Sequence, residues 1–372
     1  MTALVVEKAL VAFNITRVRE LAPGKQIIAV LASNAHGIGL VPMAGLAAQS
    51  GITSFAVTDP ADALVLRRAK FNTEDILILR STTLTSDIAA IAAAHATATV
   101  GSLAAANAYE AVAARLEKPL SRSGTKMRVH VEIDTGMGRY GFLPEQIDQV
   151  VSVYQSMPHL KVTGIYTHYA RAFDQSTTTS EQASAFKGVV DALRARGIDP
   201  GLVHASNSAA VFCHPELDHL DAVRIGSALT GRVTGATATG LKRVGSLRAP
   251  VVEVRQLPAG HPIGYGAVYT TKRPTRIAVL PVGYADGFMV EKSRDVYRFI
   301  DLLRYVLNDI KTWRTGGVTY VLVDGQKARV LGHVGLNHTI IDVTGIPCEP
   351  GDMVTLPASP LLVPRGIERE YI

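Results

Sequence analysis

The chain has 372 residues, of which 47% are hydrophobic and 19% are charged, and its formal net charge is +6 at pH 7. This composition excludes a disordered chain, and the length allows one large domain with a smaller second one. The basic residues are scattered and no apolar run approaches the ~18 residues of a membrane span, so we expect neither a nucleic-acid nor a membrane partner.

The cysteines and the N-terminus bear on where the protein works. Cys213 and Cys348 lack the spacing of a disulfide framework or of a metal site. The apolar run at residues 3–6 is too short for a secretory signal. We therefore expect a cytoplasmic protein that binds no metal.

After a first helix near residues 8–21, eight β-like runs alternate with helical patterns. The runs are 27–31, 53–58, 76–80, 97–101, 128–134, 162–169, 202–206 and 222–226. Most lack the alternation of a sheet with one wet face, which is typical of strands buried on both sides. They predict an α/β fold, a (β/α)8 TIM barrel, over residues 1–238. A doubly wound open sheet is the alternative, but no GxGxxG motif follows the first strand.

The Gly- and Thr-rich link at 231–240 predicts a domain boundary. Beyond it, short strands separated by Gly and Pro turns predict a mainly-β C-terminal domain over 239–372. Near 296–313 the apolar residues recur at helical spacing, which predicts a helical insertion. We expect its apolar stripe to pack on the body of the protein or on a partner subunit.

Polar and small residues follow the predicted barrel strands, where this fold carries its chemistry. Ser208, Gly226 and Ser227 could offer hydroxyl and N–H groups to a phosphate. His168 could lie flat against a cofactor ring, and Arg224 could direct a fixed positive charge at it. Singly, each has an ordinary structural explanation, such as an ion pair or a core histidine. Together, on successive strand ends, they favour a cofactor site.

Several segments resemble, in order, the signatures of alanine racemases, pyridoxal-phosphate (PLP) enzymes built from a barrel and a β-domain. They are AVLASNAHGIG, VHVEIDTGMGRYGF, GIYTHYA, VHASNSAA, VRIG, IGYG and VGYADGF. The resemblance implies PLP as the cofactor and alanine or a related amino acid as the substrate, and it leaves a larger amino acid open. It implies that His168 lies against the pyridine ring and that Arg224 contacts its nitrogen, with His204 behind. The implied phosphate contacts are His36, Ser208, Gly226 and Ser227.

The resemblance also implies roles on the substrate side. Arg139 would lie near the cofactor oxygen and the substrate carboxylate, Tyr265 would be the catalytic tyrosine, and Tyr284 and Leu336 would line the substrate. The family's tyrosine reaches the barrel mouth of the other subunit, so a head-to-tail homodimer is implied. Glu132 stands where many members carry a lysine modified to a carbamate, and its carboxylate would supply the charge that orients Arg139.

The serious departure from the family is Ala32, which occupies the position of the lysine that forms the Schiff base with PLP. Without that amine we expect PLP to bind non-covalently or as an external aldimine, and racemase activity to be impaired. Two explanations stay open, an engineered Lys-to-Ala substitution and a natural, repurposed relative. The alternative function is a non-catalytic protein that binds PLP or a PLP–amino-acid adduct. A barrel enzyme without PLP would leave the arrangement of Arg224 and Ser208 unexplained.

Overall fold

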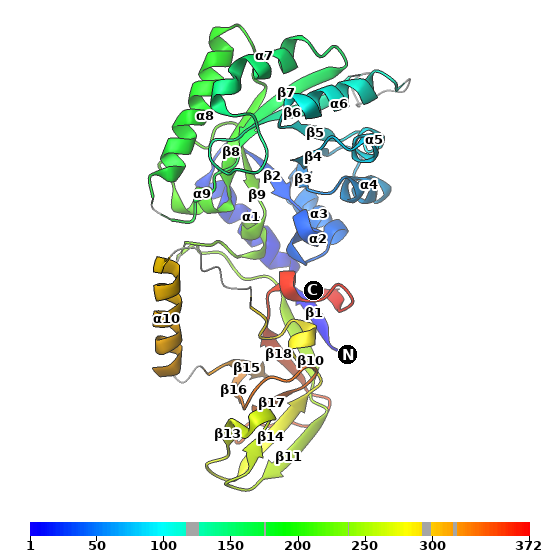
Figure 1. Ribbon diagram of the computed structural model, residues 1–372. Coiled ribbons are helices and arrows are strands. Elements are labelled where there is room, and N and C mark those ends of the chain that lie inside the picture. The colour runs from blue at the N-terminus through cyan, green and yellow to red at the C-terminus, as the bar shows by residue number, and fades with distance from the viewer. Residues whose placement is uncertain (117–125, 175, 237, 292–298, 315–317) are drawn as a thin grey trace. The chain divides into compact units, whose positions relative to one another are not determined.

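Eight parallel strands close into a barrel in the computed structural model, which describes all residues except 117–125, 175, 237, 292–298 and 315–317 (Figure 1). The barrel strands are β2 (Gln26–Val30), β3 (Ser54–Val57), β4 (Asp75–Ser81), β5 (Thr97–Val100), β6 (Met127–Ile133), β7 (Leu160–Thr167), β8 (Leu202–Asn207) and β9 (Ala222–Ile225). Every residue of β3, β5 and β9 is buried. The predicted (β/α)8 barrel is therefore confirmed, and burial on both faces explains why its strands lack alternation.

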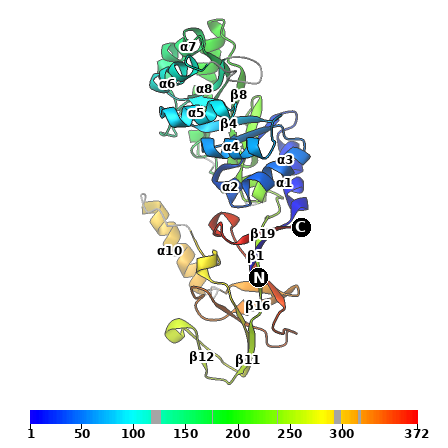
Figure 2. The same ribbon diagram turned by 90° about the vertical axis from the view of Figure 1, so that its right-hand side faces the viewer.

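Helices surround the strands of this unit (Figure 2). They are α1 (Lys8–Leu21), α2 (Ala32–His36), α3 (Leu40–Gln49), α4 (Pro60–Arg68), α5 (Thr85–Ala93), α6 (Leu103–Ala113), α7 (Ile147–Gln155), α8 (Thr178–Ala195) and α9 (Ser208–Cys213). Local signals start several of them. Asp59 accepts a hydrogen bond from the Ala61 N–H at 2.9 Å before Pro60, and Ser102 accepts one from Ala105 at 3.1 Å.

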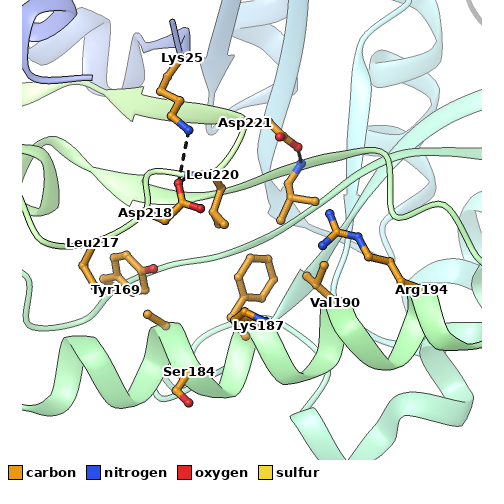
Figure 3. Close-up of a pocket in the computed structure, with 13 residues that line it drawn as sticks. Lys25, Tyr169, Ser184, Lys187, Val190, Arg194, Leu217, Asp218, Leu220 and Asp221 are labelled. Atoms are coloured by element: carbon orange, nitrogen blue, oxygen red, sulfur yellow. Dashed lines mark hydrogen bonds and ion pairs between the residues drawn. The ribbon is translucent and has the colours of Figure 1, made fainter. Parts of the chain in front are cut away.

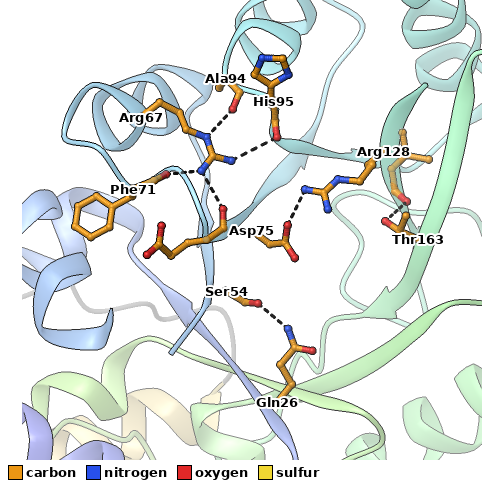
Figure 4. A network of polar contacts seen from close by, with 11 residues as sticks. Gln26, Ser54, Arg67, Phe71, Asp75, Ala94, His95, Arg128 and Thr163 are labelled. Carbon is orange, nitrogen blue, oxygen red and sulfur yellow. Dashed lines mark hydrogen bonds and ion pairs between the residues drawn. The ribbon is translucent and has the colours of Figure 1, made fainter. Parts of the chain in front are cut away.

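A polar network lies at the amino-terminal ends of the barrel strands (Figure 4). The Gln26 amide donates to the Ser54 hydroxyl at 2.6 Å, and the Arg128 guanidinium lies 2.8 Å from an Asp75 carboxylate oxygen. These side chains line a cavity of about 210 Å³ that also includes His130. The cavity at this end of the barrel therefore has both polar and apolar lining residues, the latter including Ile28 and Leu77.

The C-terminal unit is built on a nine-stranded sheet in the order β11-β14-β17-β16-β15-β18-β10-β1-β19. Its strands are β1 (Ala3–Val6), β10 (Ser246–Pro250), β11 (Glu253–Leu257), β14 (Thr275–Leu280), β15 (Tyr320–Val323), β16 (Gln326–Val330), β17 (Thr339–Asp342), β18 (Met353–Pro357) and β19 (Glu368–Tyr371). A separate hairpin pairs β12 (Pro262–Ile263) with β13 (Tyr269–Thr270). The predicted mainly-β C-terminal domain is confirmed.

The first strand belongs to this second unit and not to the barrel. β1 pairs with β10 and β19, and the two compact units are residues 8–244 and residues 1–7 with 245–372. This differs from the expected barrel boundary of 1–238. A run of four apolar residues shows no alternation of polar and apolar positions, so the sequence does not indicate which of the two sheets it joins.

Helix α10 (Phe299–Arg314) occurs at the predicted insertion, and residues 296–298 lie outside the described residues. Its described apolar side chains are 45–79% exposed: Phe299, Leu302, Leu303, Val306, Leu307 and Ile310. Within the described residues of the C-terminal unit this face is therefore largely exposed, and its expected packing on the body or on a partner subunit stays a prediction. Within the described residues, no helix is both long and apolar enough to cross a membrane.

Candidate active site

A cavity of about 320 Å³ opens at the carboxyl ends of the barrel strands. Among the residues that line it are six of the predicted site residues: His36, His168, Ser208, Arg224, Gly226 and Ser227. Arg224 lies near the end of β9, and the other five follow β2, β7, β8 or β9, whose carboxyl ends meet at this end of the barrel. Ala32 is half-buried, two residues after the end of β2, and is not among the described residues that line this cavity. The described residues that line the cavity include no lysine.

The turn after β2 has an unusual backbone. Ser33, Asn34, Ala35 and His36 all have φ between 52° and 56°, which is one turn of left-handed helix built from four non-glycine residues. Each such residue is disfavoured by roughly 1–2 kcal/mol. The Asn34 carboxamide oxygen supports the turn by accepting from the Leu40 N–H at 2.9 Å. Strain of this kind is characteristic of functional sites.

His36, Ser208 and Gly226 form a cradle for an anion. The Ser208 hydroxyl accepts from the N–H groups of Gly226 at 3.1 Å and Ala228 at 3.3 Å, which leaves its hydrogen free to donate. His36 Nε2 is buried without a hydrogen-bond partner. A Cβ on residue 226 would lie 2.5 Å from that atom, so only glycine leaves the cradle open. Burial lowers the pKa of His36, so its ring is neutral, and the tautomer with hydrogen on Nε2 would donate to a phosphate oxygen.

Arg224 carries a buried positive charge to the same cavity. It is 2% exposed, and its guanidinium donates to His204 Nδ1 at 2.7 Å and to the carbonyl oxygens of Thr167 at 2.7 Å and Ala205 at 3.1 Å. Burial lowers its pKa, and the nearby Tyr166 opposes that effect. The guanidinium is therefore fixed in orientation by acceptors that carry no full charge.

His168 is kept neutral. Burial, together with the positive charges of Arg224 and Arg139, lowers its pKa to about 3. A neutral imidazole presents a flat face and no charge to a ring bound against it. Its main-chain oxygen accepts from the side chain of Gln182 at 3.3 Å.

Gln182 is a positioning residue that sequence reasoning missed. It lies on α8, is 2% exposed, and its amide also donates to Thr135 Oγ1 at 3.2 Å, while its oxygen accepts from the Ala170 N–H at 2.9 Å. It thereby ties the loop after β6 to the loop after β7. The only signal in the sequence would have been a polar residue on the buried face of an amphipathic helix.

Arg139 and Glu132 do not meet as the resemblance implied. Arg139 is exposed, and its guanidinium carbon lies 5.6 Å from the centre of the Tyr140 ring. Glu132 is 2% exposed and its Oε2 has no partner. No ion pair between the two occurs among the described residues, so Glu132 acts on Arg139 only through its field.

The three predicted site residues of the C-terminal unit share one exposed patch. Tyr265, Tyr284 and Leu336 are 80%, 53% and 50% exposed. The Tyr284 N–H donates to the Gly335 oxygen at 3.1 Å, and Tyr265 Cε2 would lie 3.9 Å from a Cβ on Gly335. Three aromatic or apolar side chains gathered on a surface are suited to contact a partner or a ligand.

A second cavity, of about 480 Å³, lies between α8 and the segment before β9 (Figure 3). It includes Lys25 and Lys187, but none of the predicted site residues. Lys25 Nζ lies 3.3 Å from an Asp218 oxygen, and Lys187 pairs with Asp191 on the same helix. Neither lysine therefore supplies the amine that position 32 lacks.

Comparisons with known proteins agree with this geometry. The family "Alanine racemase, N-terminal domain" matches residues 6–233, and "Alanine racemase, C-terminal domain" matches residues 244–361. The chain is 33% identical to an alanine racemase of Methanococcus maripaludis over 92% of this chain and 85% of that protein. It is 34% identical to one from Limosilactobacillus fermentum, over 91% and 84%. A solved alanine racemase of Clostridium difficile superposes with a TM-score of 0.82 at 26% identity, covering 100% and 95%.

Proposed function

The chain belongs to the alanine racemase family, and from that membership we propose that it binds PLP at the barrel mouth. Its substrate in this proposal is alanine or a related small amino acid, and its racemase activity is impaired because residue 32 is alanine. The observation that carries the proposal is the cradle of His36, Ser208 and Gly226 beside the buried Arg224. These residues suit a ligand with a phosphate at one end and an aromatic nitrogen at the other.

The site residues divide the work by their chemistry. When bound, PLP supplies an electron sink that stabilises negative charge at the substrate Cα. His36, Ser208, Gly226 and Ser227 hold the phosphate, and the neutral ring of His168 lies against the cofactor. Arg224 can only donate hydrogen bonds, so it favours an unprotonated pyridine nitrogen, and His204 supports it from behind. Arg139 holds the substrate carboxylate.

Racemisation requires a proton to leave one face of Cα and another to arrive on the opposite face. We assign one face to the Tyr265 hydroxyl, with Tyr284 and Leu336 beside the substrate. Ala32 has no group that could hold a proton on the other face. Because Tyr265 is 80% exposed in its own unit, we propose that it serves the barrel mouth of a second copy in a head-to-tail homodimer.

A second function is favoured by the lack of a lysine among the described lining residues. In this alternative the chain holds PLP or a PLP–amino-acid adduct without turnover. The exposed Tyr265 and Tyr284 argue against it, because a carrier needs neither. Turnover by a variant with lysine at position 32 would separate the two functions.

The direct test is a titration of the chain with PLP. We expect saturable binding that dialysis reverses, and no cofactor attached at the cavity after borohydride reduction, because the described residues that line it include no lysine. Equilibrium dialysis and mass spectrometry of the reduced protein measure the two quantities. Absence of binding, or reduction onto a lysine with full alanine racemisation, would contradict the proposal.

Replacing Gly226 by alanine should weaken PLP binding about 100-fold. The new Cβ would lie 2.5 Å from His36 Nε2 and 3.3 Å from Val30 Cβ, so His36 would be displaced from the phosphate. A lost hydrogen bond to a charged group together with overpacking amounts to roughly 3 kcal/mol. The matched control is Gly188→Ala on α8, where an added Cβ meets nothing within 4 Å. Equal affinities of the two variants would place the phosphate elsewhere.

A further inference from the structure

Three buried side chains are joined end to end inside the barrel. Arg224 on β9 contacts His204 on β8, with 2.7 Å between Nη1 and Nδ1. His204 contacts His130 on β6, with 3.0 Å between Nε2 and Nδ1. Their exposed fractions are 2%, 0% and 7%. The chain of contacts therefore runs from the barrel mouth into the interior.

The chemistry of the groups determines where each hydrogen lies. A guanidinium only donates, so His204 Nδ1 accepts and carries no hydrogen. A neutral His204 then carries its hydrogen on Nε2 and donates it to His130 Nδ1. His130 in turn carries its hydrogen on Nε2. One tautomer of each ring satisfies both contacts.

A proton on either ring would break this arrangement, because two N–H groups would then face each other. Burial and the charges of Arg128 and Arg224 lower the pKa of His130 to about 3, although the carboxylate of Asp75 opposes this shift. Burial and Arg224 lower the pKa of His204 well below its usual range. Both rings therefore stay neutral, and Arg224 keeps the charge.

Packing holds both rings in place. Tyr166 stacks on His204 with ring centres 5.0 Å apart, and its hydroxyl lies 3.0 Å from Thr99 Oγ1. A Cβ on Gly164 would lie 2.7 Å from His130 Nε2, so glycine at this position makes room for the His130 ring. His130 also lines the cavity of about 210 Å³ at the amino-terminal end of the barrel, beside the Asp75–Arg128 pair drawn in Figure 4.

We propose that His130 is a positioning residue for the cofactor site. As the last acceptor of the chain, it holds the His204 ring, and through it the orientation in which Arg224 meets the cofactor ring. Without an acceptor at position 130, the buried His204 N–H would lose the partner that it has among the described residues, and the ring would gain by rotating away from Arg224. The effect on the cofactor rests on the proposed function, whereas the hydrogen positions do not.

Two variants separate the acceptor from the packing. His130→Asn places an amide oxygen about where Nδ1 lies, and His130→Leu fills the space without an acceptor. His219→Leu is the control, because His219 is 6% exposed and bonds to Ser206 but not to this chain of contacts. Nitrogen-15 NMR of the imidazoles reads the tautomers in the free protein. Dialysis and the absorption spectrum read the binding of PLP.

We expect His130 and His204 to be neutral with hydrogen on Nε2 between pH 5 and 8. His130→Leu should weaken PLP binding about five- to tenfold, the size of one lost hydrogen bond, and should shift the absorption band of bound PLP. His130→Asn should keep the affinity for PLP within about twofold of that of the unaltered chain, and should leave the absorption band where the unaltered chain has it. His219→Leu should change neither the affinity nor the band.

Hydrogen on Nδ1 of His204 would overturn the chain of contacts. If His130→Leu and His130→Asn weaken PLP binding equally, or if His219→Leu weakens it as much, then His130 contributes only by packing. If the unaltered chain binds no PLP, the proposed function fails and the role toward the cofactor fails with it. The tautomers decide the hydrogen-bond chain independently of that result.

Discussion

Ala32→Lys should convert the chain, in the presence of PLP, into a racemase roughly 10³-fold faster than the unaltered chain. Residue 32 lies two positions after the end of β2, and the resemblance to alanine racemases implies that the Schiff-base lysine belongs at this position. The lysine would restore both a covalent link to the cofactor and a base on the face opposite Tyr265, and a positioned base alone contributes roughly 10²–10⁴-fold. The ratio of D- to L-alanine and a new visible band measure the two effects.

The matched control is Ala32→Met, which adds a side chain of similar length without an amine. It should give neither the band nor turnover, because length alone supplies no nucleophile. If the band appears but alanine is not racemised, the assignment of the cofactor site is supported and the substrate is a larger amino acid. Absence of the band in Ala32→Lys would contradict the assignment of position 32 and favour the binding protein.

The barrel could be predicted because its strands carry their own signal. Eight apolar runs without alternation, each followed by a helical pattern, are compatible with few folds other than a closed parallel barrel. The short run at β1 has no such signal, since four apolar residues fit either sheet. Its place depends on pairing with β10 and β19, which lie more than 200 residues away.

Site residues could be predicted only where their position at the end of a strand identifies them. The rule that chemistry follows strand ends selects His36, His168, Ser208 and Arg224, and the structure brings them to one cavity. Their roles toward a cofactor stay predictions.

Other features of the site depend on contacts that no local pattern encodes. Gln182 joins two loops, and His130 contacts Arg224 only through the ring of His204. The left-handed turn at residues 33–36 was equally out of reach, because nothing in Ser-Asn-Ala-His demands positive φ.

Glu132→Gln should remove a pH-dependent loss of stability from the barrel unit. Burial raises the pKa of Glu132 from its ordinary 4.5 to about 7, although the Tyr166 hydrogen bond and the charge of Arg139 oppose this. The folded chain therefore holds this proton more tightly than the unfolded chain does. Its contribution to stability is complete below pH 4.5 and is lost as the pH rises through 7.

The two pKa values correspond to a difference of about 3 kcal/mol between pH 4.5 and 8. Glutamine carries no charge at any of these pH values and keeps an oxygen that accepts from Tyr166. Relative to the unaltered chain, the free energy of unfolding of Glu132→Gln should therefore rise by about 3 kcal/mol from pH 4.5 to 8. Urea denaturation at both pH values, followed by a signal from the barrel unit, measures this difference.

The difference in the free energy of unfolding between Glu132→Gln and the unaltered chain also separates the pH dependence of Glu132 from that of the buried histidines. Burial lowers the pKa values of His130, His168 and His204, so their contributions are lost as the pH falls below about 6.5, opposite to the trend of Glu132. Both proteins share those losses, which cancel in the difference. The control Glu145→Gln removes an exposed carboxylate and should leave the difference near zero. A Glu132→Gln curve parallel to that of the parent would mean that Glu132 is already solvated, and that its field on Arg139 is weak.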